Sequence, residues 1–88
     1  MKQRYLEVNF CKGKPFAACL YLPCAKGSRV AKTVDGGHGM RVDLDENGAP
    51  LGVEITDPAT VKHEHLNDVL ASHGVSALGE DEWAPLAA

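Results

Sequence analysis

Long apolar runs are missing from this sequence, and cysteines are few. No stretch of residues is long and apolar enough to cross a bilayer, and the N-terminus lacks the pattern of a signal peptide. The three cysteines, Cys11, Cys19 and Cys24, form no C-x-x-C pair, and an odd number argues against a disulfide framework. We therefore expect a single domain over the 88 residues, located in the cytoplasm and not bound to a membrane.

Basic residues are scarce beyond residue 34. Residues 1–34 hold seven Lys or Arg and a single acid, Glu7, whereas residues 35–88 hold two basic residues and eleven acids. The net charge of −3 gives the whole molecule no general attraction for nucleic acid, and we predict no nucleic-acid partner. The unequal halves could mark a basic binding face, but we expect them to neutralise each other within the fold or across an oligomer.

The strongest local signal is the segment 40–56, MRVDLDENGAPLGVEIT, with Asn47-Gly48 near its centre. Asn-Gly between alternating apolar residues predicts a β-hairpin closed by a type I′ turn, which needs positive φ at both central positions. A turn centred there predicts four cross-strand pairs: Leu44 with Leu51, Val42 with Val53, Met40 with Ile55 and Arg41 with Glu54. The first three pairs would share an apolar face, and the fourth would join opposite charges on the other face.

Three further segments alternate with the period of a strand. They are residues 5–10 (YLEVNF), 16–22 (FAACLYL) and 29–34 (RVAKTV). Turns rich in glycine or proline separate the first two at 12–15 and the third from the hairpin at 35–39. The connections are too short for crossover helices, so residues 5–56 should form an antiparallel sheet of four or five strands, largely a meander.

The apolar period changes to about 3.6 residues after the hairpin. Asp57-Pro58 is typical of a helix start and Gly74 of a helix end, which predicts one amphipathic helix over residues 57–74 on a face of the sheet. In the tail 75–88, three acids precede Trp83, which predicts a short C-terminal helix. We thus expect an α+β fold, with Trp83 covering apolar surface of its own chain or of a neighbour.

One helix cannot cover both faces of a sheet whose second strand is apolar on both sides. The face expected to lie away from the helix carries Ala17, Cys19, Tyr21 and Ala31. We therefore predict a homo-oligomer, most simply a symmetric homodimer, that buries this face. If the C-terminal tail with Trp83 folded over the same face, no second copy would be needed to cover it.

A calcium-loop pattern, D-x-[DN]-x-[DN]-G-x5-E, is matched inside the hairpin by Asp43, Asp45, Asn47, Gly48 and Glu54. Such a loop lies between two helices, whereas the flanking residues here alternate as strands do. The expected pairing also places Glu54 beside Arg41, far along the strand from Asn47, so the ligands could not converge. We favour a plain hairpin with solvated acids and keep calcium binding as an alternative.

Histidines and nucleophiles give no recognisable site. His63 and His65 are two residues apart on the expected helix and point to nearly opposite sides, so one helix cannot offer both to a metal. No serine lies in a nucleophile elbow, and the glycine-rich stretch 36–39 lacks the Lys-Ser/Thr of a phosphate loop. We therefore predict no catalytic residue, no cofactor-binding residue and no metal ligand.

The hairpin segment 42–55, VDLDENGAPLGVEI, follows LYLP at 20–23 and VAKTV at 30–34. In these segments the chain resembles a family of short bacterial proteins catalogued as a domain of unknown function. The family pattern is a Y-[IL]-x-L strand, a V-x-x-T-V strand and a D-x-D-x-x-G-x-x-x-G-[IV]-E-I hairpin, and the resemblance covers residues 5–58. It implies a small β-rich domain with a helix and supplies no catalytic residues.

On these grounds we expect a non-enzymatic module for protein interaction or regulation. Its first partner should be a second copy of the same chain, in a homo-oligomer, and a further partner should be another protein. Two alternatives stay open. One is a metal-binding domain, with calcium at the hairpin acids or zinc at a Cys/His cluster. The other is a small ligand-binding or enzymatic domain with its site at the subunit interface.

Overall fold

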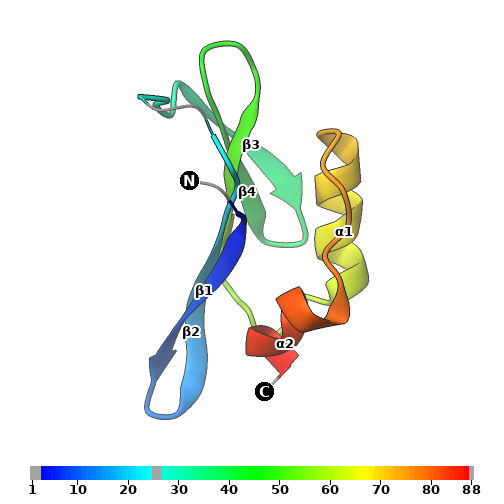
Figure 1. Cartoon of the computed structure of the whole chain (residues 1–88). Helices are drawn as coiled ribbons and strands as arrows, with labels where there is room; N and C mark the ends of the chain where they lie inside the picture. The colour runs from blue at the N-terminus through cyan, green and yellow to red at the C-terminus, as the bar shows by residue number, and fades with distance from the viewer. Residues whose placement is uncertain (1–2, 25–26, 88) are drawn as a thin grey trace.

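Five antiparallel strands form one sheet, and both helices lie on the same side of it, which makes the fold α+β (Figure 1). The structure is a computed structural model that describes residues 3–24 and 27–87. The strands are β1 (Tyr5–Cys11), β2 (Lys14–Tyr21), β3 (Lys32–Gly37), β4 (Met40–Leu44) and β5 (Pro50–Ile55), and the helices are α1 (His63–Ser72) and α2 (Glu80–Ala87).

The strand order is β1-β2-β5-β4-β3, which differs from a continuous meander. Three of the pairs are hairpins between sequence neighbours, but β2 pairs with β5 and not with β3. The third strand is also displaced from its expected position at 29–34. It begins at Lys32 and includes Asp35 and Gly36, which we had expected in the turn.

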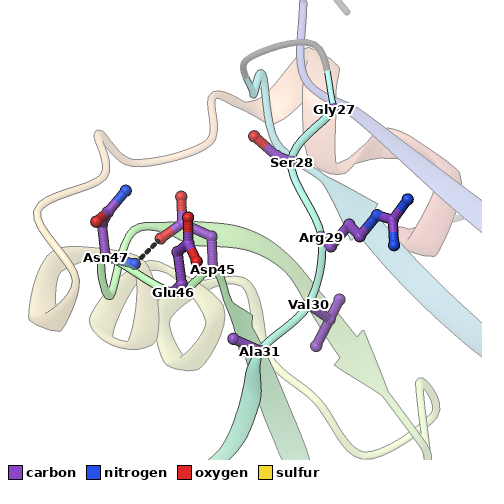
Figure 2. A pocket seen from close by; sticks show the side chains of 8 residues that line it. All are labelled: Gly27, Ser28, Arg29, Val30, Ala31, Asp45, Glu46 and Asn47. Atoms are coloured by element: carbon purple, nitrogen blue, oxygen red, sulfur yellow. Dashed lines mark hydrogen bonds between the residues drawn. The ribbon is translucent and has the colours of Figure 1, made fainter.

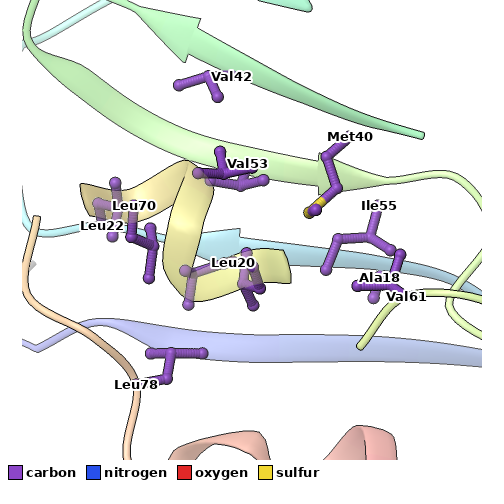
Figure 3. Packing of buried hydrophobic residues seen from close by; sticks show 12 residues of the cluster. Ala18, Leu20, Leu22, Met40, Val42, Val53, Ile55, Val61, Leu70 and Leu78 are labelled. Carbon is purple, nitrogen blue, oxygen red and sulfur yellow. The ribbon is translucent and has the colours of Figure 1, made fainter. Parts of the chain in front are cut away.

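The pairing of β2 with β5 extends two apolar rows across the helix-facing side of the sheet. Cross-strand pairs align one row through Leu6, Leu20, Val53, Val42 and Val34, and a second through Val8, Ala18, Ile55 and Met40. The members contributed by β2, β4 and β5 are at most 5 % exposed and form the core (Figure 3). Next to β3, β2 would meet Lys32, Val34 and Gly36 on this side, so burial of apolar surface favours β5 as its neighbour.

The predicted central hairpin forms between β4 and β5. Three of the four expected pairs are present, namely Met40 with Ile55, Arg41 with Glu54 and Val42 with Val53. The fourth is wrong, because Leu44 lies opposite Pro50 and the register shifts between Asp43 and Leu44. The shift compensates for a turn that differs from the expected one.

The turn of this hairpin is a three-residue loop instead of a two-residue type I′ turn. Gly48 has a positive φ of 83° but Asn47 does not, so the type I′ requirement is not met. Asp45 accounts for the difference, because its carboxylate accepts the backbone N–H groups of Asn47 and Ala49, each at 2.8 Å. The Asp45 carbonyl also accepts the N–H of Gly48 at 3.0 Å. This side chain holds the wider loop closed.

The other two hairpins have the positive φ pairs that a type I′ turn requires. These are Lys12-Gly13, at 54° and 80°, and His38-Gly39, at 53° and 75°. The first hairpin also contains a β-bulge, since Asn9 pairs with Ala17 and Phe10 with Pro15. Phe16 is therefore the extra residue, and it lies in β2, so β1 keeps a regular alternation.

Helix α1 begins later than predicted and ends where predicted. The N–H of Thr60 binds the carbonyl of Asp57 at 3.2 Å, so the Asp-Pro sequence closes a separate turn, and α1 begins at His63. At the other end Gly74 has a φ of 73°, and the N–H of Val75 reaches back to Leu70 at 2.9 Å. That pattern is a Schellman motif, which explains the glycine.

Both helices contribute to one core on their side of the sheet. In α1 the buried residues are Leu66, Val69 and Leu70. Leu78, just before α2, is 3 % exposed, and Trp83 of α2 packs partly buried against the same cluster. Trp83 therefore covers the apolar surface of its own chain.

Candidate functional site

The acids of the predicted calcium pattern do not converge. Asp43 accepts a hydrogen bond from the hydroxyl of Thr33 at 2.7 Å, and Glu54 lies opposite Arg41. Asp45 is occupied by the backbone of its own turn. Among residues 3–24 and 27–87, no group of three or more His, Cys, Asp or Glu is placed to hold a metal ion. Asp43 and Asp45 thus accept hydrogen bonds from β3 and from the turn, respectively.

The histidines lie on the helix side, and two of them meet through the fold. The ring of His38, at the β3–β4 turn, stacks on that of His65 of α1, with centroids 3.8 Å apart and planes 8° apart. Rings stacked face to face do not direct their nitrogens at a common point, so the pair is no chelate. His63 stacks on Trp83, and its Nε2 lies 2.7 Å from the carbonyl oxygen of Leu78. No spacing in the sequence signals either stack.

A hollow of about 390 Å³ lies between the loop 27–31 and the β4–β5 turn. Figure 2 shows the carboxylates of Asp45 and Glu46 on one side and Arg29 directed away from them on the other. The dashed bond in that view is the one from the Asn47 N–H to Asp45, so this carboxylate already has a partner. The hollow offers no set of converging groups that would bind or transform a small molecule.

The outer face, defined here as the sheet face opposite the helices, has an aromatic part and a charged part. One row of cross-strand neighbours runs Tyr5, Tyr21, Gly52, Asp43, Thr33, and the next runs Glu7, Cys19, Glu54, Arg41, Asp35. Tyr5 and Tyr21 stack with ring centroids 4.8 Å apart. The face predicted to be buried in a dimer therefore carries paired charges as well as Ala17, Cys19 and Tyr21, while Ala31 is exposed and outside the strands.

Two side chains of the outer face are held in their neutral forms. Burial raises the pKa of the Cys19 thiol, a hydrogen bond with Tyr21 partly opposes this, and the carboxylates of Glu54, Asp43 and Glu7 raise the pKa further. Cys19 and then Glu7 in turn raise the pKa of Tyr21 to about 12. A thiol that stays protonated at neutral pH is a poor nucleophile. This chemistry opposes a catalytic role for Cys19.

Gly52 forms the floor of a hollow of about 210 Å³ on the outer face. Cys19, Cys24 and Asp43 are among the residues that line it. A Cβ atom on Gly52 would lie 2.9 Å from the carbonyl oxygen of Leu20 in β2, so the two backbones approach too closely for any side chain. The glycine of the hairpin motif therefore has a packing reason that the pattern alone did not show.

Arg4 ties the start of the sheet to the start of α2. Its guanidinium donates to Glu82 at 2.7 and 2.9 Å, to the carbonyl of Ser76 at 2.6 Å and to that of Ala77 at 2.8 Å. The hydrogen bonds from Arg4 to Glu82, with a further one from the Gly79 N–H, lower the pKa of Glu82 from 4.5 to about 2. Residues 4 and 82 are too far apart in sequence for any local pattern to indicate the pair.

We expect the Arg4–Glu82 contact to make the docking of α2 dependent on pH. Because the folded state lowers the pKa of Glu82, this contribution to stability is full above pH 4.5 and is lost as the pH falls towards 2. The Glu82 side chain is 40 % exposed, so the loss should be only about 1 kcal/mol. Urea unfolding followed by the fluorescence of Trp83, the only tryptophan, would measure it.

The matched variant for this test is Glu82→Gln, which keeps the shape of the side chain and removes its charge. Wild type should be the more stable protein at pH 7, and the difference should shrink to nearly zero at pH 2. An equal difference at both pH values would show that the charge of Glu82 does not hold α2.

Exposed aromatic and apolar residues lie on β1, on β2 and in the loop after β2. Tyr5, Phe10, Phe16 and Val30 are each at least half exposed. The β1–β2 hairpin extends beyond the two helices at one end of the molecule (Figure 1). Phe10 and Phe16 flank its basic turn, Lys12-Gly13-Lys14. Exposed aromatic side chains on such a projection are typical of a contact surface.

Comparison of the chain with protein-family models, with curated proteins and with solved structures finds no match. Within the described ranges, neither helix has the length and apolar character needed to cross a bilayer.

Proposed function

We propose that this protein is a non-enzymatic module for protein interaction or regulation that acts as a homo-oligomer, most simply a homodimer. The observation that carries the proposal is the placement of both helices on one side of the sheet (Figure 1). Within the described residues, no helix or strand covers the outer face, although loop residues Ser28 and Val30 lie over part of it near Gly52. The edge strand β1 pairs on one side only, and Tyr5, Phe10 and Phe16 stay exposed. An uncovered edge and exposed aromatic residues favour association with another chain.

The chemistry of the side chains supports a non-enzymatic role. Cys19 and Tyr21 are held neutral, and the carboxylates of Asp43 and Asp45 accept hydrogen bonds from nearby groups. No pair of a nucleophile and a base is present in these contacts. We also propose the relationship to the bacterial family of unknown function, on the hairpin motif and the segments 20–23 and 30–34. A cytoplasmic location is proposed because the sequence shows no membrane-spanning run and no signal-peptide pattern.

One observation favours a second candidate function, a ligand site at a subunit interface. The hollow above Gly52 has thiols on its walls and opens on the outer face. A second copy seated on that face would close it. At about 210 Å³ the hollow is smaller than most ligand pockets, so we place this candidate after the interaction module.

The proposal predicts that the protein at tens of micromolar sediments at twice the chain mass of 9.4 kDa. Analytical ultracentrifugation over a hundredfold range of concentration would measure the mass and the dissociation constant. A mass of one chain at every concentration would contradict the homo-oligomer.

A second measurement addresses a different partner. Cross-linking in a native bacterial lysate should trap one stoichiometric companion with wild type, and much less of it with the double variant Phe10→Ser, Phe16→Ser. Both side chains are more than half exposed, so the variant should still fold.

A further inference from the structure

Strand β1 is an edge strand of the sheet, and Glu7 is the one charged residue in its sequence. It is the first strand in the order β1-β2-β5-β4-β3, so only one of its sides is paired within the described residues. Its sequence, YLEVNFC, contains no lysine and no proline, and the bulge of this hairpin lies in β2. A regular edge strand with a single charge, no lysine and no proline can serve as a template for another strand. Helix α2 contacts β1 and lies beside it on the helix side of the sheet (Figure 1), so a second strand at this edge would also lie close to α2.

The sequence of β1 is complementary to itself in an antiparallel arrangement. A two-fold axis perpendicular to the sheet keeps the faces of both copies aligned, so residues opposite each other must share a face. Overlap over the full strand then sets Tyr5 opposite Cys11, Leu6 opposite Phe10, Glu7 opposite Asn9, and Val8 opposite Val8 of the second copy. Every one of these pairs joins residues of the same face.

This register brings compatible side chains together. On the helix side, Leu6 of one copy would cover Phe10 of the other, which is 55 % exposed in the single chain. On the outer side, Glu7 meets the neutral Asn9. A shift of two residues in one direction sets Glu7 opposite Glu7, which repels, and in the other direction it leaves Tyr5 and Leu6 unpaired. The full overlap is the register that the sequence specifies.

We infer that the homodimer forms by antiparallel pairing of β1 with β1 of a second copy, which joins two five-stranded sheets into one. This inference rests on the proposed self-association and assigns its surface. It differs from the expected contact through the outer face, where Glu7, Glu54, Arg41 and Asp35 form a charged row that a partner would have to desolvate. Of these four charges only Glu7 lies in β1, and the unpaired backbone groups of the β1 edge find partners in the second strand.

Charge variants at position 9 test the register. Asn9 is exposed, so neither Asn9→Glu nor Asn9→Lys should disturb the fold. Asn9→Glu creates two like-charge pairs with Glu7 per dimer and should weaken the dimer about 2- to 30-fold, whereas Asn9→Lys should strengthen it by a similar factor. The control Ala59→Glu adds the same charge at an exposed turn residue and should leave the dissociation constant unchanged.

A thiol placed opposite Cys11 tests the pairing directly. The variant Tyr5→Cys should form covalent dimers when oxidised glutathione is added, and the double variant Tyr5→Cys, Cys11→Ser should not. Positions 5 and 11 of one chain lie about 20 Å apart along the strand, so they cannot bridge within a molecule.

The outcomes separate this inference from the proposed function. The dimer would use the outer face if its dissociation constant were unchanged by the Asn9 variants, if no 5–11 cross-link formed, and if Ala17→Glu dissociated it. In that case the β1 pairing would be wrong, but self-association would be correct. A monomer at all concentrations would contradict both. Charge-dependent dissociation together with the cross-link would establish the β1 edge as the interface.

Discussion

Replacing Leu66 by alanine is expected to lower the free energy of unfolding by about 2–5 kcal/mol. Leu66 is 0 % exposed and lies in α1, at the boundary between the helix and the sheet. Removing its side chain leaves a cavity that the surrounding side chains can fill only in part. A domain of this length is stable by roughly 4–13 kcal/mol, so the loss would be a large part of the total.

The cost is high because α1 depends on this contact. A helix of ten residues is not stable alone in water, so α1 is held by the apolar residues that it turns to the sheet. Those residues in turn cover the central row of Leu20, Val53 and Val42. Loss of packing at Leu66 therefore weakens the helix and the cover of the sheet together.

Urea unfolding followed by circular dichroism would measure this effect. The matched control is Leu86→Ala in α2, where the same atoms are removed from a side chain that is only partly buried. We expect the control to cost less than half as much. Equal losses for the two variants would mean that α1 is not the main cover of the core.

Local signals in the sequence predicted much of the central hairpin and one helix end. Val42 and Val53 follow from alternation, since a shift of one residue would turn every apolar side chain of β4 and β5 to the wrong face. Gly74 follows from the need for a positive φ after the last helical turn. Each of these features depends on residues that are close in the chain.

The predictions were wrong where a side-chain hydrogen bond or a strand distant in sequence determined the local backbone structure. Asp45 accepts two backbone N–H groups and so replaces the type I′ turn expected at Asn47-Gly48. Pro58 is also compatible with a turn, and Asp57 closes one with Thr60 before α1 begins. The pairing of β2 with β5 brings together residues that are far apart in sequence, and local periodicity carries no information about it.

The bulge at Phe16 could have been predicted from the sequence. A two-residue turn at Lys12-Gly13 sets Tyr5 opposite Leu20, yet these residues belong to different faces by their alternation. One extra residue in a strand resolves the conflict and sets Tyr5 opposite Tyr21, as the structure has it. By contrast, the contacts of Arg4 with Glu82 and of His38 with His65 join elements that only the complete fold brings together.

Replacing Gly52 by alanine is expected to lower the free energy of unfolding by about 1–3 kcal/mol, although it adds only one methyl group. The new carbon would lie 2.9 Å from the carbonyl oxygen of Leu20, and this neighbour is the backbone of β2, which cannot rotate away. The φ of Gly52 lies outside the left-handed region, so the cost comes from this contact and not from backbone strain. Thermal and urea unfolding would give the loss.

Gly36→Ala is the matched control, because it adds the same methyl group in β3. There the nearest atom is a side-chain carbon of Val69, at 3.2 Å, which can move by a few tenths of an ångström. We expect a smaller loss of unfolding free energy for this variant.

Hydrogen exchange would locate the effect of each variant in the sheet. Gly52→Ala should speed the exchange of the amides that are hydrogen-bonded between β2 and β5, whereas Gly36→Ala should not. Because β1 is joined to the rest of the sheet only through β2, the Gly52 variant should also loosen the edge that we assign to the dimer. If Gly52→Ala unfolds at the same urea concentration as wild type, β2 and β5 do not approach as closely as their pairing requires.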